Sequence, residues 1–162
     1  MTAVKNIIFL CTGNSCRSPI AEGIARKIFA DHGLKHNVSS YGTLDIGQQP
    51  PAEKAQRVCK AHGIDISGHR SHQLTDSAAR DADIILIMEN AHKDWISTDF
   101  DKEIARKAFL ITEYGCDNSL DFADIPDPIG FPQDFYENIF KMLWGEINRI
   151  AKYECELEKF RI

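Results

Sequence analysis

The chain has 162 residues, of which 43% are hydrophobic and 27% are charged, and its formal net charge is -5. This length suits a single domain over residues 1–162, large enough to bury a core without a structural metal or disulfide. The acidic balance disfavours general attraction to nucleic acid or to an acidic membrane surface, so neither is expected as a partner.

The first half of the chain predicts two strand and helix pairs. The apolar run at residues 4–11 predicts a buried strand, and apolar residues at helical spacing predict a helix over residues 18–32. Residues 36–43 predict a second strand, and residues 52–62 predict a helix that ends at a glycine. The loop between these two elements is predicted at residues 44–51.

The second half repeats this alternation. Strands are predicted at residues 83–88 and 107–111, and helices at residues 91–97 and 133–156. The segment at residues 120–132 holds too many Asp and Pro residues for regular structure. The alternation predicts an α/β fold: a three-layer open parallel sheet of about four strands, with helices on both faces and a ligand site beyond the carboxyl ends of the strands.

The stretch CTGNSCRSP, between the first strand and the first helix, carries the clearest chemistry. Small residues here allow successive backbone N–H groups to surround an oxyanion, and the start of the helix adds positive potential. Arg17 offers paired donors for two phosphoryl oxygens, and Cys11 lies in a field that favours its thiolate. The stretch predicts a phosphate-binding loop with a thiolate nucleophile, although an inert core cysteine or a non-catalytic phosphate-binding module remain alternatives.

This stretch, extended to CTGNSCRSPIAEG, resembles the phosphate-binding loop of the low-molecular-weight protein tyrosine phosphatases. The sequence DPIG at residues 127–130 resembles the general-acid loop of the same family, and the resemblance extends over essentially the whole chain. It implies a four-stranded parallel sheet and a two-step hydrolysis through a cysteinyl-phosphate. It implies no metal and no cofactor.

The resemblance also implies a role for individual residues. Cys11 would be the nucleophile, Arg17 would bind the phosphoryl oxygens, and Asp127 would protonate the leaving oxygen and then act as a base toward water. Asp121 and Asp124 are interpreted as solvated loop carboxylates. The residues assigned to phosphate binding are Thr12, Gly13, Asn14, Ser15, Cys16 and Ser18.

A supporting network is implied around this loop. By its family role Ser18 hydrogen-bonds the thiolate, and Asn14 holds the strained loop together with Ser40 and His69. His69 could equally be a surface residue, and His72 receives no role.

The five cysteines bear on the compartment and on redox chemistry. Their irregular spacing favours free thiols over a disulfide framework or a zinc site, and no stretch reaches the roughly 18 apolar residues of a membrane span. Because the N-terminal segment also lacks the features of a secretion signal, a cytoplasmic location is expected. Cys16 resembles the second cysteine with which this family forms a reversible disulfide, and its alternative is a filler of the loop.

The predicted substrate depends on the residues around the loop. Family members that act on phosphotyrosine place aromatic walls where this chain has Ile129 and Leu44. Together with Ser15, these aliphatic walls resemble the protein arginine phosphatase branch. The arsenate reductase branch is disfavoured because LIMENAHKDW lacks its pair of redox cysteines. A phosphotyrosine protein is the predicted substrate and a phosphoarginine protein the alternative, with inorganic phosphate as product and inhibitor.

Overall fold

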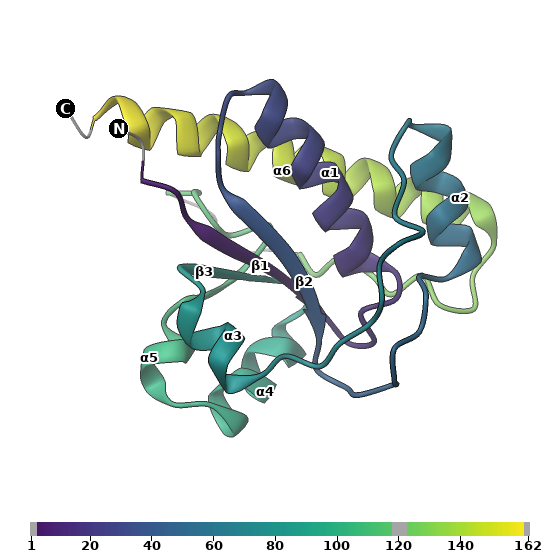
Figure 1. Cartoon of the computed structure of the whole chain (residues 1–162), viewed down its shortest axis with the longest axis horizontal. Helices are drawn as coiled ribbons and strands as arrows, with labels where there is room; N and C mark the ends of the chain where they lie inside the picture. The colour runs from purple at the N-terminus through teal and green to yellow at the C-terminus, as the bar shows by residue number, and fades with distance from the viewer. Residues whose placement is uncertain (1–2, 118–122, 161–162) are drawn as a thin grey trace.

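The computed structural model describes residues 3–117 and 123–160 and is built around a four-stranded parallel sheet (Figure 1). The order of the strands across the sheet is β2-β1-β3-β4, and each neighbouring pair is parallel. The predicted α/β fold with a parallel sheet is therefore confirmed. The strands are β1 (Asn6–Cys11), β2 (Asn37–Gly42), β3 (Ile84–Ile87) and β4 (Ala108–Leu110).

Helices cover both faces of this sheet (Figure 1). One layer contains α1 (Arg17–Asp31), α2 (Glu53–Ala61) and α6 (Gln133–Lys159). The other layer contains α3 (Asp76–Asp81), α4 (Asn90–Asp99) and α5 (Lys102–Ala105). No helix within the described ranges is both long enough and apolar enough to cross a membrane.

The central strand β1 is buried on both faces because its side chains alternate between the two layers. Ile7 and Phe9 join the core under α1, α2 and α6, whereas Ile8 and Leu10 join the core under α3, α4 and α5. This double burial explains why the sequence shows a continuous apolar run here instead of an alternation of apolar and polar residues. The strand ends at Cys11, which pairs with Gly42 of β2.

Two helices were not predicted from the sequence. The helices α3 and α5 have six and four residues, too few to show an apolar repeat. Each begins at a side-chain cap: Thr75 accepts from the N–H of Ala78, and Asp101 accepts from the N–H of Ile104. The remaining predicted elements are present, with ends that move by up to three residues; α6, for example, continues to Lys159.

The segment predicted as irregular is described only in part. Residues 123–132 form neither helix nor strand, as expected. Asp121, interpreted above as a solvated carboxylate, lies outside the described residues.

Candidate active site

The loop between β1 and α1 lies at the carboxyl edge of the sheet, where the chain leaves the central strand. Its carbonyl groups are bound to surrounding segments: Thr12 O accepts from Leu44 N at 3.0 Å, and Ser15 O accepts from Ala52 N at 2.9 Å. The N–H groups of residues 12–16 make no hydrogen bond to any described residue. Because helix α1 also begins here without a side-chain cap, the loop presents a set of unused donors that suits an anion.

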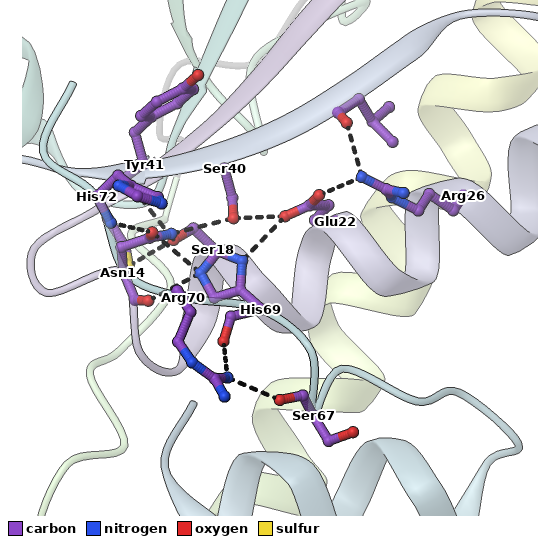
Figure 2. A network of polar contacts seen from close by, with 12 residues as sticks. Asn14, Ser18, Glu22, Arg26, Ser40, Tyr41, Ser67, His69, Arg70 and His72 are labelled. Carbon is purple, nitrogen blue, oxygen red and sulfur yellow. Dashed lines mark hydrogen bonds and ion pairs between the residues drawn. The ribbon is translucent and has the colours of Figure 1, made fainter. Parts of the chain in front are cut away.

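Asn14 fixes the shape of this loop from the inside (Figure 2). It has a φ of 52°, in the left-handed region that Asn tolerates better than most residues, and it is fully buried. Its Nδ2 donates to Ser18 Oγ at 2.8 Å and to Ser40 Oγ at 3.0 Å. Its Oδ1 lies 3.0 Å from both His69 Nε2 and the backbone N of His72. The structure therefore brings Asn14, Ser40 and His69 together, and it adds the backbone of His72.

Glu22 extends this network on the side away from the loop (Figure 2). Its Oε2 accepts from Ser40 Oγ at 2.6 Å and lies 3.6 Å from His69 Nδ1. Burial lowers the pKa of His69, and the charge of Glu22 opposes that shift without reversing it. Glu22 was not predicted from the sequence, because a Glu one helical turn after Ser18 also suits an ordinary position on the surface of a helix.

The thiol of Cys11 is 3% exposed and lies at the end of β1. Its Sγ is 2.9 Å from Ser18 Oγ. Because Asn14 already donates to that hydroxyl, Ser18 keeps one proton to donate, either to Cys11 Sγ or to Tyr41 O at 3.3 Å. A thiolate at Cys11 would accept a hydrogen bond from this hydroxyl.

Arg17 is a buried cation, 1% exposed, that is held from several directions. Its Nη1 lies 2.7 Å from Glu89 Oε1 and donates to Ile125 O at 2.8 Å. Its Nη2 lies 3.6 Å from Asp127 Oδ2 and 3.5 Å from Thr12 Oγ1. The structure thus brings together Arg17 and Asp127, which lie far apart in the sequence.

The two described carboxylates of the acid loop differ in their surroundings. Asp124 Oδ1 accepts from the backbone N of Asn90 at 2.9 Å and from its Nδ2 at 3.1 Å, so this carboxylate is bound to the start of α4. The Asp127 side chain is 42% exposed and approaches Arg17. Asp127 Oδ1 accepts from the backbone N of Ile129 at 3.1 Å, and its Oδ2 lies on the side of Arg17, so of the two carboxylates it is the one placed to give a proton to a molecule bound at the loop.

His92 is a site residue that the sequence analysis missed. It is 3% exposed, and its Nε2 lies 3.0 Å from Thr12 Oγ1. Its Nδ1 accepts from the backbone N of Glu89 at 3.2 Å, as part of a capping box at the start of α4. Burial, followed by the charge of Arg17, lowers the pKa of His92 to about 4. The Glu-x-x-His spacing could have indicated the cap, but it gives no sign of the contact with Thr12.

Apolar side chains are exposed on the segments beside the loop. The predicted walls Leu44 and Ile129 are 53% and 57% exposed. Ile46, 41% exposed, was not predicted, although a Cβ placed on Gly13 would lie 3.8 Å from its Cδ1. The two predicted wall positions are therefore aliphatic, and an exposed aromatic residue, Phe131, follows Ile129 on the same segment.

Cys16 lies beneath the loop and against α6. It is 2% exposed, and its Sγ lies 3.5 Å from Tyr136 Oη. Burial raises the pKa of the Cys16 thiol. Like the other four cysteines of the chain, it is a free thiol.

A comparison with protein families gives this geometry its context. Residues 6–159 match the family described as low molecular weight phosphotyrosine protein phosphatase. The chain belongs to this family. The predicted resemblance is confirmed, and the relatives of this chain include proteins named as tyrosine phosphatases and as an arginine phosphatase.

Relatives of the phosphatase include enzymes named for different substrates. It is 36% identical over 139 residues to the low molecular weight protein-tyrosine-phosphatase Etp of Escherichia coli. The aligned region covers 86% of this chain and 87% of that protein. Its fold is similar to that of the YwlE arginine phosphatase from Geobacillus stearothermophilus, with a TM-score of 0.87, 30% identity and coverage of 98% and 97%. It is also similar to the tyrosine phosphatase Wzb of Escherichia coli in complex with sulphate, with a TM-score of 0.81, 29% identity and coverage of 93% and 98%.

Proposed function

We propose that this phosphatase hydrolyses phosphotyrosine in proteins through a covalent intermediate on Cys11. In the first step Cys11 Sγ forms a bond to phosphorus, the bond from phosphorus to the tyrosine oxygen breaks, and Asp127 gives that oxygen a proton. In the second step water attacks phosphorus, Asp127 takes a proton from the water, and the sulfur leaves as a thiolate. Inorganic phosphate is the product and, by occupying the same loop, an inhibitor.

The observation that carries this proposal is the grouping of a nucleophile with unused donors on one short loop. Cys11 Sγ lies next to the hydroxyl of Ser18, and the N–H groups of residues 12–16 have no acceptor among the described residues. Arg17 adds a buried positive charge, and Asp127 lies 3.6 Å from it. A dianionic phosphoryl group would satisfy these donors, and backbone donors aimed at developing charge also stabilise a transition state.

The remaining predicted residues support the loop in this proposal. Ser18 donates a hydrogen bond to the thiolate, while Asn14, Ser40 and His69 hold the loop in the conformation that the anion needs. Leu44 and Ile129 form the walls against which the substrate side chain packs. No metal or cofactor takes part.

A phosphoarginine protein is the second candidate substrate, and the aliphatic walls favour it. A phenol ring gains from aromatic neighbours, and the predicted wall positions hold Leu44 and Ile129 instead. Ser15 is a small polar residue of the loop and leaves room for a guanidinium. Similarity to the YwlE arginine phosphatase supports the same alternative.

A substrate panel tests the proposal. Matched peptides that carry phosphotyrosine, phosphoarginine or phosphoserine are compared by kcat/KM, with the Cys11→Ser protein as the blank. We expect the phosphotyrosine peptide to give the highest value and the phosphoserine peptide to give almost none. A higher value for phosphoarginine would move the chain to the second branch, and equal rates with Cys11→Ser would refute the proposed chemistry.

We also propose that Cys16 protects Cys11 from irreversible oxidation. Peroxide would convert the Cys11 thiolate to a sulfenic acid, and the Cys16 thiol would displace water from it to form a disulfide. Mild peroxide should therefore inactivate the enzyme, dithiothreitol should restore it, and bound phosphate should protect it. The Cys16→Ser protein should recover poorly. Detection of Cys11 as a sulfinic acid in the oxidised wild type would contradict this role.

Two broader inferences complete the proposal. The redox chemistry and the free thiols suit a reducing compartment, so we infer a cytoplasmic location, with a phosphorylated protein and not nucleic acid or a membrane as the partner. We further infer that residues 1–162 form one domain, since a single four-stranded sheet with a core on each face joins the elements of the described chain.

A further inference from the structure

We propose that His92 is a positioning residue that orients the Thr12 hydroxyl, so that this hydroxyl donates a hydrogen bond to the bound phosphoryl group. The inference rests on the proposed phosphatase function and adds a side-chain donor to the backbone donors of the loop. The contact that suggests it joins two separate elements: Thr12 follows β1, and His92 lies in α4.

The contacts of the His92 ring show which of its nitrogens carries the proton. The backbone N of Glu89 lies 3.2 Å from His92 Nδ1 and has a hydrogen to donate, so Nδ1 is the acceptor. The imidazole is neutral near neutral pH because burial and Arg17 both disfavour its charged form. Its proton therefore lies on Nε2, the atom 3.0 Å from Thr12 Oγ1. His92 is the donor in this contact and Thr12 is the acceptor.

The Thr12 hydroxyl has one further side-chain partner besides His92. Arg17 Nη2 lies 3.5 Å from Thr12 Oγ1 and is also a donor, because a guanidinium has no acceptor. Both side-chain contacts of this oxygen within the described ranges are thus with donors. A hydroxyl whose lone pairs face two donors has its own proton available for an acceptor on a third side.

The exposure of the surrounding residues indicates where the proton of the Thr12 hydroxyl points. His92 and Arg17 are 3% and 1% exposed, whereas Thr12 is only half-buried. The proton therefore points away from the buried donors, toward the open part of the loop that holds the unused N–H groups of residues 12–16. An anionic oxygen at that place would accept a charge-assisted hydrogen bond, the stronger kind.

Glu89 holds His92 and Arg17 in place beside the Thr12 hydroxyl. Its Oε1 lies 2.7 Å from Arg17 Nη1 and 3.5 Å from His92 Nε2, so one carboxylate contacts both donors of the Thr12 hydroxyl. The ring of His92 is held at its other nitrogen by the backbone of the same residue. Rotation of the imidazole would break both contacts.

The test measures anion affinity and requires no turnover. Orthovanadate and inorganic phosphate are titrated into the reduced wild-type protein and its variants by calorimetry. Thr12→Val removes the hydroxyl at nearly constant volume, and we expect the dissociation constant of each anion to rise about tenfold, the usual effect of losing a hydrogen bond to a charged group. Thr12→Ser keeps a hydroxyl and should stay near the wild-type affinity. Thr98→Val, which removes an exposed hydroxyl of α4, is the matched control.

The role of His92 is tested by a double-mutant cycle. His92→Phe preserves a ring but removes the donor, and it should weaken anion binding about as much as Thr12→Val. In the Thr12→Val background the same change should have no further effect, since His92 acts through a hydroxyl that is then absent. A purely structural role in the α4 cap would lower stability and leave this coupling at zero.

Three results would overturn the inference. Equal loss of affinity in Thr12→Val and Thr12→Ser would mean that packing matters and the hydroxyl does not. Unchanged affinity in His92→Phe, or losses that simply add in the double variant, would remove the positioning role. If these results occur in an enzyme that still hydrolyses the phosphotyrosine peptide, only this inference fails; if the wild type neither binds the anions nor shows turnover, the proposed function fails with it.

Discussion

The two ends of strand β1 both carry buried ionisable groups, but they use them in opposite ways. Lys5 lies just before the strand, and its Nζ lies 2.5 Å from Oε2 of Glu154, a carboxylate that is 1% exposed. Tyr114 donates to the other oxygen at 2.7 Å, and His36 Nε2 lies 3.3 Å from Oε2. Every oxygen of this carboxylate therefore has a partner within the protein.

The internal partners of Glu154 also set its pKa, whereas the donors at the opposite end of the strand are left without an acceptor. Burial alone would raise the pKa of Glu154, but hydrogen bonds from His36, Lys5 and Tyr114 outweigh it and lower the pKa to about 2. The loop after Cys11 instead leaves the N–H groups of residues 12–16 without an acceptor among the described residues. The buried carboxylate with all its partners inside the protein stabilises the fold, whereas the loop with unbonded backbone donors is prepared for a ligand.

The largest effect is expected from the nucleophile. Cys11→Ser should abolish measurable turnover of an aryl phosphate, because a serine hydroxyl is a much weaker nucleophile than a cysteine thiolate. It should still bind phosphate, since the loop donors and Arg17 remain. Stopped assays together with calorimetry measure both properties, and Cys116→Ser is a matched control. Turnover near the wild-type rate would remove Cys11 from its role.

The next largest effect is expected at Asp127. Asp127→Asn should lower kcat by about 10²- to 10⁴-fold for an alkyl or weakly acidic phenyl phosphate, the usual range for general acid catalysis. The loss should be smaller for p-nitrophenyl phosphate, whose leaving group needs little protonation. Asp124→Asn, which alters the carboxylate bound to the start of α4, is the control. A uniform loss for all leaving groups with Asp127→Asn would contradict the acid role.

At the end of the strand next to Lys5, a substitution should change stability instead of activity. Glu154→Gln leaves Lys5 without its charge partner and should lower the free energy of unfolding by about 3 kcal/mol at neutral pH. Urea denaturation measures the change, and kcat/KM of the folded variant should stay close to that of the wild type. Glu146→Gln, in a half-exposed pair with Arg149, should change stability by less than about 1 kcal/mol. A large loss of activity in folded Glu154→Gln would show that the two ends are coupled.

The smallest effect concerns the dependence of stability on pH. The pKa of His92 is about 4 in the folded protein and near 6.5 when unfolded, so its stabilisation is complete above pH 6.5 and is lost as the pH falls toward 4. Between pH 6.5 and 5 this amounts to about 1.5 kcal/mol, and His92→Phe should lack that part of the slope. Glu154 loses its contribution lower, between pH 4.5 and about 2. Identical slopes in wild type and His92→Phe above pH 5 would contradict a buried neutral imidazole.

The sequence allowed the sheet and the loop to be predicted because their signals are local. The apolar run of β1 and the stretch from Cys11 to Ser18 carry strand burial, helix start and anion chemistry in consecutive residues. The helices α3 and α5 left no repeat to detect, since each depends on a single capping side chain, Thr75 or Asp101.

Residues that act only through tertiary contact could not be predicted. His92, Glu22 and Tyr136 all lie on helices, where their types and spacing suit an ordinary surface or core position. Their contacts with Thr12, Ser40 and Cys16 follow from the packing of helices against the loop. Distinguishing Asp127 from Asp124 by its Asp-Pro context, in contrast, needed only neighbouring residues, and the binding of Asp124 at the start of α4 agrees with that distinction.

Helix α6 lies late in the chain and contacts the segments that precede and follow β1. Near its start Tyr136 supports Cys16, and near its end Glu154 neutralises Lys5. During translation the phosphate loop and β1 leave the ribosome long before this helix exists. The nascent chain therefore carries a reactive thiol without its final support, and the site is completed only when α6 has emerged and docked. Cys16 therefore gains its contact with Tyr136 only after the start of α6 has been synthesised.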